Sequence, residues 1–319
     1  MGRRVLIGLA AACAAIFAPA VAQADTLNAT CATLQDQLNA ANGGDEVVLA
    51  AAGGLCSGSY YLPDVTITLT GEDGAGFQPT DEESSRSLYN GESGVDETVR
   101  HLVFKGNAAG AGGFQFYGSG APTIEDSTFS GISETYSGGA LEIFCNGHVV
   151  LRGDTFTGNT AGISGGGARI GAASVTVEDS TFSGNEAGQD GGGLAITTDA
   201  SGDAAPTAFR GRVAVGGADV TLTGNTFSGN VAGNPTPASN ADGTGGGGGL
   251  WVGKNGDAID GAQLASIPPY GTSGGSTVSV ALTRNVFDAN AIADGDDSRS
   301  GGGAEFMGAH VNSYRNRFT

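Results

Sequence analysis

The chain has 319 residues with 33 acidic and 14 basic side chains, which gives a formal net charge of −19 at pH 7. Such a chain repels nucleic acid and anionic membrane surfaces, so neither is expected as a partner. Its 58 glycines do not recur at every third residue, which excludes collagen. Their fixed relation to Val, Ile, Leu and Phe speaks against disorder.

Residues 1–24 are predicted to be a secretory signal peptide. Arg3 and Arg4 precede an apolar run over 5–17, and a small-residue cleavage site follows at 22–24. The run is too short to cross a bilayer comfortably, so cleavage is preferred over a membrane anchor, and no later run is long enough to span. The mature protein is therefore expected to be secreted or to lie at the cell surface, without a membrane span.

Residues 25–60 are predicted to form an N-terminal cap, made of a helix and a first strand. The stretch 33–41 begins with a capping-type Thr and places Leu34 and Leu38 at i, i+4, and the Asn-Gly-Gly at 42–44 ends it. A β-structure with an open end needs such a cover over its unpaired edge.

Three cysteines remain after the signal peptide, which itself contains Cys13. Cys31 and Cys56 flank the cap and are the expected disulfide in an oxidising compartment. Cys145 follows an apolar strand and is expected to be a buried thiol. Because neither a C-x-x-C phrase nor a His pair accompanies them, metal binding by these cysteines is not expected.

Residues 61–319 are predicted to form the body of the fold, in which the acidic, Gly/Ser-rich stretch 71–98 is expected to be a surface loop. The chain then becomes self-similar: Phe129, Phe156 and Phe182 are 27 and 26 residues apart, and each lies ten residues before a Gly of a Gly-Gly phrase. Insertions in later copies fall at only two places in the repeat, as loops on a repeat scaffold do. The insertions are 197–215, 231–247 and 253–276.

Apolar and polar residues alternate in two short phrases of each repeat, which predicts strands with one buried face. Repeats of this length, stacked one per coil, bury a continuous core. The predicted fold is all-β: a right-handed parallel β-helix, a single solenoid with three-sided coils and a short N-terminal capping helix. We expect one column of rings stacked inside it: Phe129, Phe156, Phe182, Phe227 and Phe287.

An Asn column accompanies the Phe column, three residues further along each repeat. It comprises Asn159, Asn185, Asn230 and Asn290, and Ile132 interrupts it in the first coil. A structural ladder is the preferred interpretation, because Asn tolerates turn conformations and stacked amides bond to each other between coils. A polar binding stripe is the alternative.

One outward-facing column supplies the candidate ligand-binding residues: Glu142, Arg169, Trp251 and Glu305. Trp251 is the single Trp of the chain, and it is either a sugar-stacking platform or a residue packed beneath the flanking insertions. A second column contains Glu125, Arg152 and Glu178, and stacked opposite charges explain such acids without any ligand.

No catalytic residue is predicted. A glycoside hydrolase needs two carboxylates facing one cleft, whereas Glu142 and Glu305 lie several coils apart. A polyuronate lyase needs a cluster of cationic groups, whereas Arg169 stands alone on its strand. No cofactor is expected, and the loop 294–297, Asp-Gly-Asp-Asp, is expected to be solvated, with loosely bound calcium as the alternative.

The sequence resembles two families of proteins. Gly-Gly-Ala-Leu or Gly-Gly-Leu phrases paired with a Phe-x-x-Asn box are similar to the repeats of chlamydial polymorphic outer membrane proteins. The start at 31–42, Cys-Ala-Thr-Leu-Gln-Asp-Gln-Leu-Asn-Ala-Ala-Asn, resembles the cap of secreted bacterial β-helix proteins of the pectin-lyase-like fold. The first resemblance implies a surface passenger that acts in adhesion.

Three functions remain open at this point. The first is a non-catalytic secreted or cell-surface β-helix protein that makes surface contacts, as in adhesion, with carbohydrate or another cell-surface protein as partner. The second is a polysaccharide-binding or polysaccharide-degrading enzyme of the same fold, either a lyase or a glycosidase, and the third is a spacer. The insertions distinguish a spacer from a binding protein or an enzyme, since a spacer needs no insertions.

The C-terminal end is expected to be truncated. The Phe-x-x-Asn box is cut at Phe318-Thr319, and neither a Gly-Gly phrase nor a polar cap follows it. Repeat proteins usually need a capping terminal unit, so we expect a longer protein.

Overall fold

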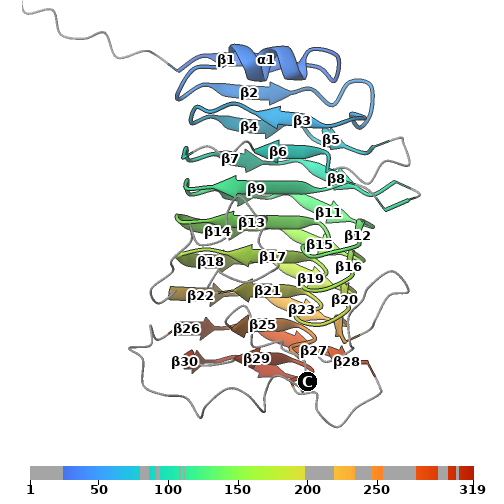
Figure 1. Ribbon diagram of the computed structural model, residues 1–319, viewed down its shortest axis with the longest axis vertical. Helices are drawn as coiled ribbons and strands as arrows, with labels where there is room; N and C mark the ends of the chain where they lie inside the picture. Colours follow the sequence, from blue (N-terminus) through green and yellow to red (C-terminus); the bar gives the residue numbers. More distant parts are fainter. Residues whose placement is uncertain are drawn as a thin grey trace, which may run out of the picture.

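A computed structural model describes residues 24–79, 86–90, 94–107, 109–110, 112–197, 219–233, 246–253, 278–293, 301–306 and 309–319. These residues form 31 strands and one short helix, stacked in successive turns along one long axis (Figure 1). Within these ranges no helix is long and apolar enough to cross a membrane. The predicted signal peptide, most of each insertion and the loop 294–297 lie outside the described residues.

All described strands belong to four parallel sheets. Sheet A contains β1 (Thr26–Ala29), β2 (Glu46–Leu49), β4 (Thr68–Gly71), β7 (Thr98–Arg100), β10 (Thr123–Glu125), β14 (His148–Arg152), β18 (Ser174–Glu178), β22 (Asp219–Thr223), β26 (Val278–Thr283) and β30 (Ala309–Tyr314). Sheet B contains β5 (Gly76–Phe77), β8 (Val103–Lys105), β11 (Thr128–Ser130), β15 (Thr155–Thr157), β19 (Thr181–Ser183), β23 (Thr226–Ser228), β27 (Val286–Asp288) and β31 (Arg317–Phe318).

Sheet C contains β3 (Tyr60–Leu62), β6 (Leu88–Asn90), β9 (Phe114–Gly118), β13 (Leu141–Cys145), β17 (Ala168–Gly171), β21 (Leu194–Thr197), β25 (Leu250–Gly253) and β29 (Ala304–Phe306). Sheet D contains β12 (Ser133–Glu134), β16 (Thr160–Ala161), β20 (Glu186–Ala187), β24 (Val231–Ala232) and β28 (Ala291–Ile292). Sheets A, B and C are the three expected sides of the coil. Sheet D, which the sequence did not predict, adds a short fourth side between B and C.

Each coil passes through the sheets in the same order, so like residues lie on like residues. Strands β14 to β17 form one coil and β18 to β21 the next, with Phe156 opposite Phe182 in sheet B and Ile170 opposite Ile196 in sheet C. Sheet A follows the same rule with Val149 opposite Val175. This register buries one face of every repeat in a continuous core.

The predicted Phe column is present inside the solenoid. From Phe129 to Phe287, neighbouring rings lie 4.7–4.9 Å apart between centroids and are within 5° of parallel. These distances match the spacing of roughly 4.8 Å between neighbouring strands. Phe104 extends the stack toward the N-terminus and Phe318 toward the C-terminus, where its ring is exposed.

The Gly ten residues after each Phe has a steric reason. A Cβ on Gly192 would lie 2.3 Å from the carbonyl oxygen of Val231 and 2.6 Å from that of Gly248 in the next coil. Any larger residue would push the coils apart. Gly166, one coil earlier, faces the corresponding carbonyls of Glu186 and Gly192.

The Asn column forms the predicted ladder. The amide oxygen of Asn185 accepts a hydrogen bond from the backbone N–H of Asn159, 3.0 Å away, and its Nδ2 donates to the carbonyl of Phe156. The same Nδ2 also donates to the Asn230 side chain, which repeats the pattern. At the interrupted position, the backbone N–H of Ile132 still donates to Asn159. Fully buried backbone donors are thus satisfied between coils.

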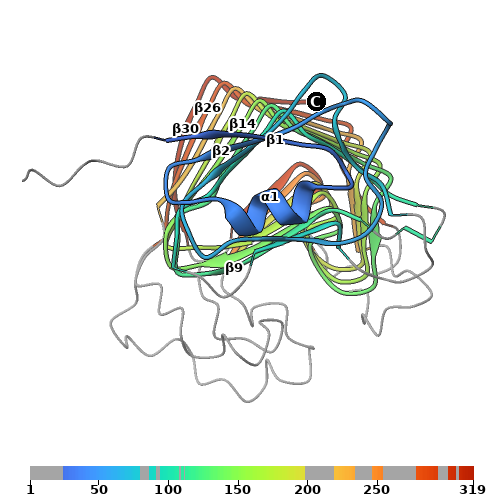
Figure 2. The ribbon, with the colours of Figure 1, turned by 90° about the horizontal axis from the view of Figure 1, so that it is seen from above.

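Helix α1 (Leu34–Ala40) lies across the open end of the solenoid, as Figure 2 shows in the view from above. Leu34 and Leu38 are fully buried in the core beneath it. Thr33 does not cap the helix through its side chain. Its hydroxyl instead accepts a hydrogen bond from the backbone N–H of Thr30.

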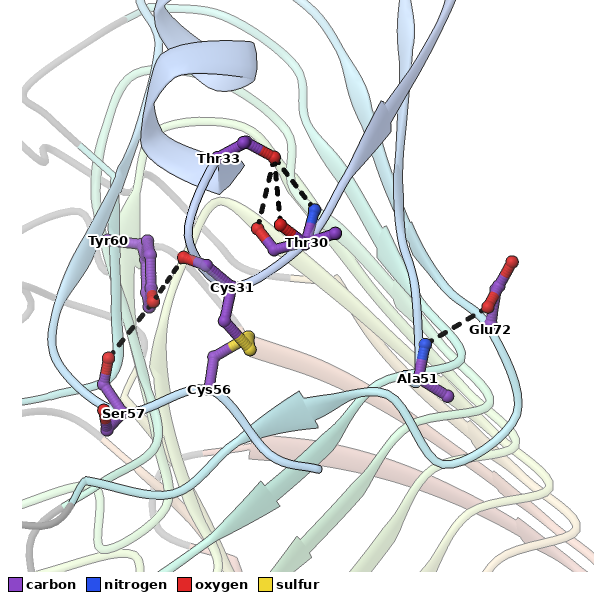
Figure 3. Close-up of a disulfide and its surroundings, with 8 residues drawn as sticks. All are labelled: Thr30, Cys31, Thr33, Ala51, Cys56, Ser57, Tyr60 and Glu72. Atoms are coloured by element: carbon purple, nitrogen blue, oxygen red, sulfur yellow. Dashed lines mark hydrogen bonds between the residues drawn. A yellow bond between two sulfur atoms is a disulfide. The ribbon is translucent and has the colours of Figure 1, made fainter. Parts of the chain in front are cut away.

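The cap is joined to the body by the disulfide between Cys31 and Cys56, whose Cα atoms are 5.1 Å apart (Figure 3). The pair that the sequence favours therefore forms. The Tyr60 hydroxyl lies beside it and donates to the carbonyls of Cys31 and Ser57. Cys145 is free and buried, and burial raises the pKa of its thiol to about 12.

The expectation of a surface loop over 71–98 is wrong. This stretch includes β5 and β6 and enters β7, so its described part belongs to the coils. Phe77 and Leu88 within it are fully buried. The acidic, Gly-rich composition concealed short strands of two and three residues, which give too little alternation to detect.

The carboxyl group of Glu97 takes the place of an apolar core residue. Glu97 is 2% exposed and precedes β7 at a position that later coils fill with apolar residues: Pro122, Val149, Val175, Val220 and Val280. Burial raises the pKa of Glu97 to about 8, against a smaller opposing effect of a hydrogen bond from Asn90, and the charge of Asp64 raises the pKa further.

Candidate functional site

The outer face of sheet C carries one column of side chains that runs through all eight of its strands. The register places these residues opposite one another in turn: Tyr61, Tyr89, Gln115, Glu142, Arg169, Ala195, Trp251 and Glu305. On β13, Leu141 and Ile143 belong to the core, so Glu142 between them faces away from it. The four predicted site residues therefore share one column, and the column begins three strands earlier than the sequence suggested.

Most of the predicted part of this column is buried, although it faces away from the core. Glu142 is 7% exposed, Arg169 2% and Trp251 3%, and Glu305 alone of the four is partly exposed. The predicted outward direction of the column is confirmed by the register, but three of its four candidate residues are covered. Strand alternation fixes the direction of a side chain but says nothing about what lies over it.

Arg86 organises the charged part of this face. Its Nε lies 3.3 Å from Glu134 Oε1, and its Nη2 lies 3.8 Å from Glu142 Oε2. The guanidinium also donates hydrogen bonds to the backbone carbonyls of Gly139 and Ser137, at 3.1 and 3.2 Å. Arg86 thereby connects the segment before β6 with the turn that leads into β13, two coils further on.

Glu134 is a departure from the repeat. It pairs with Ala161, and the following coils also place small, fully buried residues in this column of sheet D: Ala161, Ala187 and Ala232. A carboxylate in such a position needs a neutralising partner. Arg86 supplies it.

Glu142 is held by hydrogen bonds from β9. The Tyr117 hydroxyl donates to Glu142 Oε2 at 2.5 Å, and Gln115 Nε2 donates to the same oxygen at 3.0 Å. Gln115 Nε2 also donates to the Tyr117 oxygen at 2.7 Å. With Arg86 nearby, this one carboxylate oxygen therefore has three polar partners.

Arg169 lies one coil beyond Glu142 and is enclosed. Its guanidinium carbon is 5.1 Å from the centroid of the Phe144 ring, a cation–π contact. Burial lowers the pKa of Arg169, and the charges of Glu142 and Asp190 oppose that effect. The cation is therefore held inside the protein, on the Phe144 ring.

The ionisation of this cluster follows from burial. Burial raises the pKa of Glu134, the charge of Arg86 lowers it in part, and Glu142 raises it again. Burial and Glu142 likewise raise the pKa of Tyr117 far above its usual range. Tyr117 therefore keeps its proton and acts as a hydrogen-bond donor, not as a base.

Two tyrosines begin the column. The rings of Tyr61 and Tyr89 stack with centroids 5.2 Å apart and an interplanar angle of 16°, and Tyr61 is 56% exposed. The Gln35 side chain on α1 donates to the carbonyl of Tyr61 and accepts from its N–H, at 3.0 and 2.9 Å. The Tyr89 hydroxyl accepts from the Arg86 N–H at 2.8 Å. The pair is thus fixed at both ends.

Residues 89–319 match the family described as "Right handed beta helix region". The chain belongs to this right-handed β-helix family. Comparison with curated proteins gives no match. Among solved structures, an alginate lyase from Paenibacillus sp. str. FPU-7 is similar at 14% identity and a TM-score of 0.40, over 92% of this chain and 99% of that one. Nothing about activity follows from a likeness at this level.

In this β-helix protein Trp251 and Glu305 do not form a common binding or catalytic site with Glu142. Trp251 is 3% exposed, which speaks against the sugar-stacking platform; most of the insertions under which it was alternatively expected to pack lies outside the described residues. Four strand steps separate Glu142 from Glu305, about 19 Å at the usual strand spacing. Glycosidase carboxylates lie roughly 5–10 Å apart, so this pair cannot act on one bond.

The charged column on sheet A behaves as predicted. Arg152 Nη1 lies 2.6 Å from Glu125 Oε1, and its Nε lies 3.1 Å from Glu178 Oε2. All three side chains are at least partly exposed. This ladder explains the acids there without a ligand.

Among the described residues of this β-helix, no group of three or more His, Cys, Asp or Glu side chains is close enough to hold a metal ion. The acidic loop 294–297, where calcium was the alternative, lies outside the described residues.

Sequence reasoning missed the tyrosine pair, Arg86, Glu134 and Tyr117. Continuing the repeat upstream through Tyr60–Leu62 and Leu88–Asn90 would have placed Tyr61 and Tyr89 in the column. Arg86 gave no signal, because it precedes its strand and its carboxylate partners are 48 and 56 positions away in the chain.

Proposed function

We propose that this protein is a non-catalytic extracellular β-helix protein that makes surface contacts by binding a glycan on the N-terminal part of the outer face of sheet C. The observation that carries the proposal is the stacked pair Tyr61 and Tyr89, with the Tyr61 ring more than half exposed. A rigid aromatic face suits the apolar face of a sugar ring, and its hydroxyl suits the sugar's rim.

Polar side chains continue the same column. Gln115, partly exposed, follows Tyr89, and Glu142 follows Gln115. An aromatic surface beside a few fixed hydrogen-bonding groups is the usual composition of a small-molecule or sugar site. Because successive strands are roughly 4.8 Å apart, one coil advances by about the length of one hexose.

An extracellular location is supported by the predicted signal peptide and by the Cys31–Cys56 disulfide. Disulfides of this kind persist in oxidising compartments and are rare in the cytosol.

A non-catalytic role is supported by the state of the charged groups. Glu142 Oε2 already has Tyr117, Gln115 and Arg86 as partners, and Glu134 is paired with Arg86. The raised pKa of Tyr117 removes it as a general base at neutral pH.

The test is binding of the intact protein to a panel of polysaccharides by affinity gel electrophoresis, with reducing-end release as an assay of cleavage. Tyr61→Ala is expected to weaken retention by about tenfold, since losing a stacking ring and its contact area costs about 1.4 kcal/mol. Tyr314→Ala is the matched control, because Tyr314 is 57% exposed but lies on sheet A. Equal retention of both variants, or release of reducing ends, would contradict the proposal.

A further inference from the structure

The geometry points to an uncharged glycan as the ligand of this face; this inference rests on the proposed function and narrows it to one substrate class. Polymers of uronic acids carry one carboxylate per sugar, and proteins bind them with Lys and Arg that are free to meet those carboxylates. The question is therefore which cations this face can offer.

Arg86 cannot serve an acidic ligand. Its side chain is 6% exposed and lies between Glu134 and Glu142, and two of its N–H groups donate to backbone carbonyls. Moving it toward a ligand would take the cation away from Glu134 and Glu142, which costs several kcal/mol.

Arg169 is the single cation within the described strands of sheet C, and it is 2% exposed. Its guanidinium packs on Phe144, and the acidic Glu142 occupies the neighbouring position of the column. Both cations of the face are therefore buried, and Arg86 is also paired with acidic groups of the protein itself.

The composition of the neighbouring sequence does not change this balance. The sequence of 198–218 and 254–277, the two segments that follow strands β21 and β25 and are outside the described residues, contains three basic and four acidic side chains. The whole chain has a net charge of −19. A polyanion approaching the face would be repelled at long range and would meet no free cation in its described part.

The groups that do face outward suit hydroxyls. Tyr61 offers a ring, and Gln115 and Tyr89 offer partly exposed polar groups. The negative charges of Glu134 and Glu142 beside them repel uronates but not neutral sugars. Binding to a neutral glycan should therefore change little with salt, since no ion pair forms across the interface.

The experiment compares neutral polysaccharides (xylan, mannan, β-glucan) with polyuronates (alginate, polygalacturonate) at low and high NaCl. The wild-type protein is expected to be retained by at least one neutral polymer, within a factor of about two between the two salt concentrations, and by neither polyuronate. Retention by a polyuronate at least as strong as by the neutral polymers overturns the inference but leaves glycan binding intact. Retention by no glycan at all defeats the proposed function instead.

A gain-of-function variant tests the electrostatic reason directly. The double substitution Glu134→Gln with Glu142→Gln keeps the shape of the site but releases the charges of Arg86 and Arg169, so it is expected to gain retention by polyuronates that salt abolishes. The matched control is Glu125→Gln with Glu178→Gln, which releases Arg152 on sheet A, away from the site. If both double variants gain the same retention by polyuronates, the charges on sheet C do not explain the preference for neutral glycans. If either double variant fails to fold, the comparison of polysaccharides with the wild-type protein decides between neutral and acidic ligands.

Discussion

Sheet B and the outer face of sheet C are made by the same coils, yet they vary in different ways. Sheet B and the turn after it place Phe on Phe and Asn on Asn through successive coils. The outer column of sheet C changes residue type at almost every coil, from Tyr to Gln, Glu, Arg, Ala and Trp.

The difference has a physical cause. A ring or an amide inside the solenoid has its own copy as its neighbour above and below, so a change in one coil removes contacts in two others. An outward side chain is constrained mainly by the segments that cover it. Features that distinguish one repeat protein from another are therefore found where a residue departs from the repeat. Arg86, Glu134 and Glu97 are such residues.

The largest effect is expected inside the stack. Phe182→Ala removes a fully buried ring with parallel neighbours on both sides, so the free energy of unfolding should fall by about 3–5 kcal/mol. Phe144→Ala is the comparison variant, because Phe144 is equally buried but lies outside the Phe stack and contacts Tyr117 and Arg169 instead. Chemical denaturation of both variants should show the smaller loss for Phe144; the reverse order would break the comparison.

A somewhat smaller loss is expected from the charged cluster. Arg86→Met leaves Glu134 and Glu142 buried without their cation, which should cost about 3 kcal/mol at neutral pH. Since the pKa of Glu134 is already raised by burial, the loss should shrink as pH falls and the Glu134 carboxyl becomes protonated. Adding Glu134→Gln to Arg86→Met should restore part of the stability, and no restoration would mean that Arg86 acts by packing alone.

The last effect concerns Glu97, where the repeat is broken inside the core. Its folded pKa of about 8 exceeds the ordinary value of 4.5, so its contribution is fully favourable below pH 4.5 and is lost as pH rises toward 8. The expected slope is about 1.4 kcal/mol per pH unit within that window. Glu97→Gln should remove this slope, which thermal or urea unfolding between pH 5 and 7 measures against the wild type. Parallel stability–pH curves for the two proteins would contradict the assignment.

The fold was readable from the sequence because it is periodic. Phe and Gly at a fixed offset predicted the coil, the stacked rings and the Asn ladder, and the cysteines flanking the cap predicted its disulfide. The stretch 71–98 was misread because its strands β5 and β6 are only two and three residues long. Sheet D escaped notice for the same reason.

The sequence by itself determined the column that contains Glu142, Arg169, Trp251 and Glu305, because strand alternation and repeat spacing fix the direction and register of side chains. Only the tertiary structure decided that three of these four are buried, that Glu142 shares Arg86 with Glu134, and that Tyr61 stacks on Tyr89. The reason is that burial and ion pairing depend on segments outside the repeat, such as the one that holds Arg86. Their contacts join positions far apart in the chain, and no local pattern records them.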